Sequence, residues 1–165
     1  MFCLGFILVQ HIAAYMKVLA QRLLRDPCPY HSELVMILHP WFTSMWVNDY
    51  KQWKMKPKRV SFKDTPYLGW MNGTAGEDPA NKKWITDVDH LYLVCQTGGN
   101  HWVTLHVNLP RSHIDCYDCI VGEHTPISDG NIVEACRPFM RMIPQMMSKI
   151  LPPKVRIPQY DQFSF

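Results

Sequence analysis

The chain has 165 residues, of which 47% are hydrophobic, and a formal net charge of +3 at pH 7. A domain of this length can bury roughly two thirds of its unfolded surface, which allows one hydrophobic core and excludes a disordered protein. The charge is small and the basic residues are scattered apart from Lys51 to Arg59. The composition therefore gives no support for a nucleic-acid-binding protein.

The six cysteines could form three disulfides, but their positions favour reduced thiols. The apolar stretch from Met1 to Val9 has no basic flank of the kind found in secretory signals, and it is too short to span a membrane. Cys95 lies in a segment that is typical of a buried strand, where a cysteine is an ordinary core residue. We therefore expect an intracellular protein without membrane association, and the nucleus is one candidate compartment.

Two helices are predicted in the first third of the chain. From Gln10 to Arg25, apolar residues recur at steps of three and four, and Asp26-Pro27 ends the helix. A second helix spans about Pro40 to Trp53, because Pro40 suits the first helical position and large apolar residues follow at helical spacing. The tryptophans of this second helix are interpreted as core residues.

The segments around these helices are less regular. Residues 33–38 form a short apolar run that fits a strand or an extended stretch. Residues 66–80 are rich in Gly, Pro, Asn and Asp, which predicts a surface loop.

The middle of the chain predicts a β-hairpin followed by a third strand. Residues 89–96 read as a buried strand, and the turn at 97–100 connects it to a strand that begins at His101. That strand alternates, with Trp102, Thr104 and His106 on one face and Val103, Leu105 and Val107 on the other. Pro110 breaks it, and an antiparallel strand follows at 114–117. His90, at the edge of the first strand, is interpreted as structural.

The last third predicts a helix that is interrupted by proline. Ser128-Asp129 can cap a helix whose apolar stripe continues to Ile150, and its methionines are interpreted as core residues. Pro138 and Pro144 fall inside this stripe, which predicts a kink or two helices in series. Residues 154–157 are a candidate for a last strand.

A histidine and an aspartate are the main candidates for catalysis. His101 begins one strand and Asp118 follows the next, and antiparallel neighbours bring the start of one strand close to the end of the other. A carboxylate that accepts an imidazole N–H fixes the tautomer of the ring, as in a nucleophilic triad. Asp115 is a rival acid, but it is expected to point away from the face of Asp118.

The motif Asn100-His101-Trp102-Val103, followed by a strand and Tyr117-Asp118, resembles the ubiquitin-like-protease (Ulp, SUMO-protease) family of cysteine peptidases. The similarity is greatest to divergent plant members that transposable elements often carry. The interval of 17 residues from His101 to Asp118 suits that family. His11-Ile12-Ala13 resembles the family's opening His-Ile-Asp, with Ala13 where an aspartate is usual.

The resemblance implies an α+β, papain-like cysteine protease fold of the Ulp type, formed by residues 1–165 as one domain that is incomplete at its C-terminus. It implies that His101 is the general base and that Asp118 orients it. It also implies that Trp102 shields this pair and lines a narrow channel for the substrate's C-terminal tail. Gln159 would donate a hydrogen bond to the oxyanion.

The family's nucleophile is the cysteine of an Asp-Cys-Gly motif, which does not occur in these 165 residues. Pro158-Gln159 resembles the Pro-Gln that precedes this motif, so the domain is expected to be cut off before its cysteine. Cys116, Cys119 and Cys136 are poor substitutes, because they lie on strands or within the apolar helix stripe and none precedes a glycine.

A zinc site at Cys116 and Cys119, with His113 and His124, is the alternative reading of these cysteines. Strand alternation places the two thiols on different faces, and no second cysteine pair follows. We therefore expect no metal and no cofactor.

The expected activity is the removal of SUMO or a related ubiquitin-like modifier from lysine, or the maturation of a modifier precursor. A monomer is expected. The chain as written is expected to be inactive because it lacks the nucleophile. Two alternatives stay open, namely a modifier-binding module without chemistry and a non-functional gene fragment.

Overall fold

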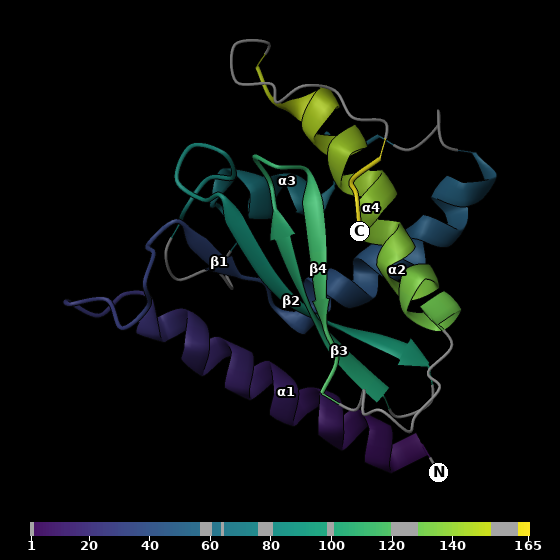
Figure 1. The fold of residues 1–165 in the computed structure, drawn as a ribbon, viewed down its shortest axis with the longest axis horizontal. Helices are drawn as coiled ribbons and strands as arrows, with labels where there is room; N and C mark the ends of the chain where they lie inside the picture. The colour runs from purple at the N-terminus through teal and green to yellow at the C-terminus, as the bar shows by residue number, and fades with distance from the viewer. Residues whose placement is uncertain are drawn as a thin grey trace.

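The computed structural model describes residues 2–56, 61–63, 65–75, 81–98, 101–119, 129–152 and 162–165. In these ranges the chain forms helices and strands in the order α1 (Phe2–Arg22), β1 (Val35–Ile37), α2 (Pro40–Met55), α3 (Pro66–Asn72), β2 (His90–Gly98), β3 (His101–Asn108), β4 (His113–Tyr117) and α4 (Asp129–Ile150). Figure 1 shows the arrangement.

The strands form one four-stranded sheet in the order β1-β2-β3-β4. The strands β2, β3 and β4 are antiparallel neighbours, and the short β1 runs parallel to β2 at the edge. Leu105, at the centre of β3, pairs with Leu93 on β2 and with Cys116 on β4. The predicted strands at 89–96, from His101 and at 114–117 are therefore confirmed.

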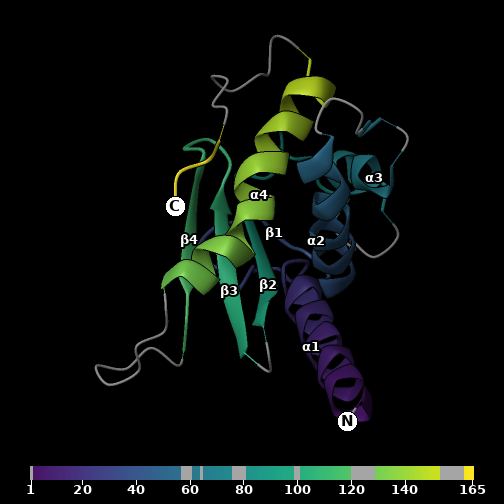
Figure 2. The ribbon, with the colours of Figure 1, turned by 90° about the vertical axis from the view of Figure 1, so that its right-hand side faces the viewer.

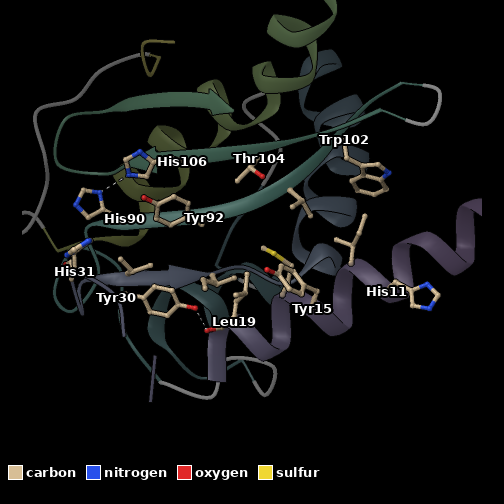
Figure 3. A pocket seen from close by; sticks show the side chains of 16 residues that line it. His11, Tyr15, Leu19, Tyr30, His31, His90, Tyr92, Trp102, Thr104 and His106 are labelled. Atoms are coloured by element: carbon tan, nitrogen blue, oxygen red, sulfur yellow. Dashed lines mark hydrogen bonds between the residues drawn. The ribbon is translucent and has the colours of Figure 1, made fainter. Parts of the chain in front are cut away.

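The helices cover the two faces of the sheet differently. On the face that bears Leu93 and Leu105, both of which are fully buried, α2 and α4 pack to form the main core (Figure 2). On the other face, α1 runs beside β1 and faces the even-numbered side chains of β2 and β3 across a cavity (Figure 3). The α+β architecture predicted from the sequence is confirmed.

Helix α1 is longer than predicted at its start, because it begins at Phe2 rather than Gln10. It ends at Arg22 rather than Arg25, ahead of the predicted Asp26-Pro27 stop. Within the described ranges, no helix is long and apolar enough to cross a membrane.

Helix α2 follows its prediction closely. His39 caps it by accepting a hydrogen bond from the backbone N–H of Trp41 at 3.2 Å, and Pro40 occupies the first turn. Trp46 is fully buried and donates from Nε1 to the carbonyl of Pro138 at 3.1 Å, which ties α2 to α4. Trp41 is 65% exposed, so its interpretation as a core residue was wrong.

The loop predicted for residues 66–80 is wrong for its first part, which is the helix α3. Tyr67, Trp70 and Met71 share one face of this helix and are buried in the core. Pro66 stands in its first turn, and Gly73 ends it in the left-handed conformation, with φ of 70°. The residues that suggested a loop are thus partly the stop signals of a short helix.

Helix α4 runs through both prolines as one element, so the alternative of two helices in series was wrong. Pro144 has no N–H to give to the carbonyl of Met140, four residues earlier. That carbonyl instead accepts from the backbone N–H of Phe163 at 2.9 Å, and the Phe163 side chain is buried. A distant segment therefore replaces the missing hydrogen bond. Ser128 and the predicted strand at 154–157 lie outside the described residues.

Candidate active site

The start of β3 and the residue that follows β4 bring His101 and Asp118 together. The register pairs Thr104 with Tyr117, so the start of β3 lies beside the end of β4. His101 Nε2 and Asp118 Oδ2 are 2.9 Å apart, and the two side chains are only 19% and 6% exposed. The predicted pairing across the sheet is confirmed.

The second nitrogen of His101 has no such partner. With the carboxylate accepting from Nε2–H, the neutral ring presents an acceptor lone pair at Nδ1. This Nδ1 atom is buried and has no hydrogen-bond partner among the residues that the structure describes. A buried polar atom without a partner costs about 1–3 kcal/mol, so its burial here needs a physical reason.

The rival acid, Asp115, lies on the opposite face of β4. Its carboxylate accepts from His106 Nδ1 at 3.0 Å and from His113 Nε2 at 3.1 Å. The hydrogen bond from His106, helped by the charge of His113, holds the pKa of Asp115 below its usual range, although partial desolvation opposes this. The expectation that Asp115 points away from Asp118 is confirmed.

These contacts belong to a longer chain of hydrogen bonds that the sequence reasoning missed. His90 Nδ1 lies 3.0 Å from His106 Nε2, and Ser164 Oγ lies 2.7 Å from His113 Nδ1. The alternation along β3 and β4 placed His106, His113 and Asp115 on one face, and that was the available signal. Pairing of β2 with β3 adds His90 to this network, and the interpretation of His90 as structural stays a prediction.

Trp102 lies on the other face of β3 from His101 and lines a cavity of about 880 Å³ between α1 and the sheet (Figure 3). His11 and Ile12, from the segment that resembles the family's opening motif, line the same cavity. The indole Nε1 of Trp102 is buried without a partner among the described residues. The roles of Trp102 in shielding the His101–Asp118 pair and in lining a substrate channel stay predictions.

Residues 6–165 match the model of the Ulp1 protease family, C-terminal catalytic domain. The chain belongs to the Ulp1 protease family. Its helices and mixed sheet are those of an α+β fold, and the family consists of cysteine proteases that act on ubiquitin-like modifiers and their conjugates. Searches of curated proteins and of solved structures found no match.

A Ulp1-type protease needs a cysteine beside its histidine, and the described cysteines do not meet that need. Burial raises the pKa of Cys95 to about 12, and it also raises the pKa of Cys116 and of Cys136. Cys119 is exposed and Cys28 is half-buried, and neither bonds to the buried His101 Nδ1, which has no partner among the described residues.

Two candidate site residues, one from the Ulp1 resemblance and one from the zinc alternative, are not among the residues that the structure describes. Gln159 and His124 lie outside the described residues, so the oxyanion role of Gln159 stays a prediction. Within the described ranges, no cluster of three or more His, Cys, Asp and Glu side chains is arranged to hold a metal ion. Cys116 is half-buried whereas Cys119 is exposed, in line with thiols on different faces.

Proposed function

We propose that His101 and Asp118 are the general base and the orienting acid of a cysteine (iso)peptidase that removes SUMO or a related modifier from lysine, or matures its precursor. The observation that carries this proposal is the state of the His101 ring. One nitrogen is held by a carboxylate at 2.9 Å, and the other is buried and has no partner in the part of the chain that the structure describes. A thiol placed at Nδ1 would give this nitrogen its missing hydrogen bond.

In the proposed reaction, His101 Nδ1 takes the proton from the thiol, and the resulting thiolate sulfur forms a bond to the carbonyl carbon of the modifier's last residue. When the C–N bond breaks, the imidazolium returns the proton to the leaving lysine amine. Water then hydrolyses the thioester with His101 acting again as base, and the thiol is regenerated. Asp118 keeps the ring in one tautomer and stabilises the imidazolium throughout.

Other parts of the proposal concern substrate contacts. Gln159 would donate a hydrogen bond to the carbonyl oxygen as it becomes an oxyanion. Trp102, at the end of the cavity nearest His11, would contact the extended tail of the modifier. Because no described cysteine bonds to His101 Nδ1, we propose that these 165 residues alone do not catalyse the reaction.

The first test measures turnover of a fluorogenic substrate that carries the C-terminal tail of SUMO. The 165-residue chain is expected to show no hydrolysis that a thiol reagent blocks. A longer polypeptide that adds the family's Asp-Cys-Gly motif after Phe165 is expected to be active. In that polypeptide, Asp118→Asn is expected to lower kcat on the order of 10³–10⁴-fold. The matched substitution Asp115→Asn, on the other face of β4, should leave kcat within about twofold of the parent chain, because Asp115 does not contact His101. Thiol-dependent turnover by the 165 residues would refute the proposed inactivity.

The second test needs no activity. In ¹⁵N-edited NMR spectra, the Nε2–H proton of His101 is expected to give a downfield, slowly exchanging signal because it is bonded to a buried carboxylate. Asp118→Asn should abolish this signal, because an asparagine amide can donate to Nε2 and reverse the tautomer. Asp115→Asn should instead remove the Nδ1–H signal of His106. Loss of the His101 signal in both variants would contradict the assignment.

The alternative function is a module that binds the modifier without catalysis. The absence of a cysteine bonded to His101 among the described residues is the observation that favours it. It predicts that the chain captures SUMO and that His101→Ala leaves this capture intact, while no extended product hydrolyses the fluorogenic substrate.

A further inference from the structure

The cavity between α1 and the sheet has two ends, and only one of them adjoins Trp102. Figure 3 shows Trp102 and His11 at one end and His90, His106 and Tyr92 at the other. We call the second one the His90 end. The volume of the whole cavity is about 880 Å³, which lies in the range of small-molecule sites, roughly 300–1,000 Å³.

The walls of this cavity are largely apolar and hold no carboxylate, ammonium or guanidinium group. No Asp, Glu, Lys or Arg is among the residues that line it. Aliphatic and thioether side chains from α1, β1 and β2 form part of the wall, and aromatic and histidine rings form most of the rest; the former are Ile12, Met16, Leu19, Val35, Ile37 and Val94. An ionised ligand would lose its hydration here without gaining an opposite charge, so the lining favours an uncharged occupant.

The His90 end presents aromatic rings that are held in place. Tyr92 stacks on His106 with ring centroids 4.8 Å apart and an angle of 16° between the planes. The His90 ring lies tilted against His106, with centroids 5.1 Å apart. The hydroxyl of Tyr30, which also lines the cavity, is engaged with the carbonyl of Leu19 at 3.1 Å. Such rings pack best against a flat aromatic ligand.

The hydrogen bonds behind these rings fix which atom is left for a ligand. Asp115 is ionised at neutral pH and accepts from His106 Nδ1–H, so His106 Nε2 is an acceptor. His90 must then donate from Nδ1–H to His106 Nε2, and its own Nε2 is left as an acceptor. Burial, together with the neighbouring His106, lowers the pKa of His90, which keeps this ring neutral at pH 7.

We propose that the His90 end of the cavity binds a small, uncharged aromatic molecule that donates one hydrogen bond to His90 Nε2. The apolar walls supply the affinity, the stacked rings of Tyr92 and His106 orient the ligand, and His90 selects for a donor. The site lies on the face of β3 opposite His101 and does not depend on the catalytic roles proposed for His101 and Asp118.

Three naphthalene probes test the proposal by calorimetric titration at pH 7.5. They are 2-naphthol, which has a donor; 2-methoxynaphthalene, which has none; and 2-naphthoate, which is an anion. We expect 2-naphthol to bind about tenfold more tightly than 2-methoxynaphthalene, because one net hydrogen bond is worth about that factor. We expect 2-naphthoate to bind more weakly than either of the neutral probes.

Two variants locate the site. His90→Phe keeps a ring and removes the acceptor, so the preference for 2-naphthol should fall to less than twofold. Thr104→Phe places an aromatic ring in the cavity from β3 and should abolish binding of all three probes. The control is Val18→Phe, which adds the same ring on the exposed side of α1, outside the cavity, and should bind like the parent chain.

The measurement is made in the His101→Ala background, so failure of the proposed protease chemistry leaves it unaffected. Backbone amide shifts in the unmodified chain give a readout that needs no variant, and 2-naphthol should move the signals of Tyr92 and His106. Equal binding of 2-naphthol and 2-methoxynaphthalene, tighter binding of 2-naphthoate, or retained binding in folded Thr104→Phe would overturn the proposal. So would competitive displacement of 2-naphthol by a peptide that ends in Gly-Gly, since the His90 end would then belong to the channel for the modifier's tail.

Discussion

At the scale of single residues, the two aspartates at the end of β4 show how strand geometry assigns partners. Asp115 and Asp118 are three positions apart, so their side chains point to opposite faces of the sheet. One joins His101 on the face covered by α4, and the other joins His106 and His113 on the face toward α1. The same residue type therefore serves two separate networks.

Substitution of Asp115 is expected to change stability in a pH-dependent way. Its carboxyl pKa is lowered in the folded state, so the carboxylate stabilises the fold above its unfolded pKa of about 3.9, and this contribution is lost as the pH falls through the folded pKa. Asp115→Asn should therefore be less stable than the parent chain at pH 7 and 5. The difference should shrink at pH 3.5 and below. Urea unfolding at these pH values measures it, and a difference that is constant from pH 7 to 3 would contradict the expectation.

At the scale of secondary-structure elements, the alternation of apolar and polar residues was enough to predict the central strands of the sheet. The alternation from Trp102 to Val107 predicted β3 and both of its faces, and from them the meeting of His101 with Asp118. The sequence could not reveal that His101 Nδ1 is buried and unpaired, because burial depends on how α4 packs on that end of the sheet.

Two elements were mispredicted for identifiable reasons. For α3, the Gly, Pro, Asn and Asp content of residues 66–80 predicted a loop. The helical face has only three apolar residues, which is a weak signal, although all three are buried in the core. In α4, Pro138 and Pro144 predicted a kink or two helices in series, and the second alternative was wrong. The carbonyl of Met140, which Pro144 leaves without its helical donor, accepts from Phe163, more than twenty positions away. Contacts at such separations do not follow from local propensity.

The two glycines of the α3 region offer a matched test of that element. Gly73 has φ of +70°, and an added Cβ would lie 2.4 Å from the backbone oxygen of Asn81, so Gly73→Ala should cost at least about 1–2 kcal/mol. Gly69 lies inside the helix, where an added Cβ meets ordinary contacts at 3.5 Å, so Gly69→Ala should stabilise by about 0.5–1 kcal/mol. Chemical denaturation of both variants checks the opposite signs. Equal effects would argue against a helix that ends at Gly73.

At the scale of the whole molecule, the core is a layer of aromatic side chains between the sheet and the helices α2, α3 and α4. Phe42 stacks on Trp46 at 5.2 Å, and the edges of Tyr67 and Trp70 meet the Phe42 ring at 5.7 and 5.8 Å. All four side chains are buried. Because α2 supplies the residues at the centre of this layer, its attachment to α4 governs the packing of the whole fold.

Substitution of two tryptophans of α2 tests how much the contact between α2 and α4 contributes to stability. Trp46→Phe removes the Nε1–H donor and leaves the buried carbonyl of Pro138 without this partner, which should cost about 1–3 kcal/mol in addition to the lost volume. Trp41→Phe alters a side chain that is 65% exposed and should change stability by no more than about 0.5 kcal/mol. Thermal unfolding of the two variants side by side tests this ranking, and comparable losses would show that the α2–α4 contact is unimportant.

The segment 162–165 also covers part of the edge of the sheet at β4. β4 is the last strand of the sheet, and such a strand offers unpaired amides to which another chain can add, a common route to aggregation. Here Ile114 N–H donates to the carbonyl of Ser164, and Ser164 N–H donates to the carbonyl of Ser112, each at 2.9 Å. The chain's own backbone thus occupies the start of this edge, and among the described residues it leaves only the stretch from Asp115 to Tyr117, which is too short to template the stacking of further molecules.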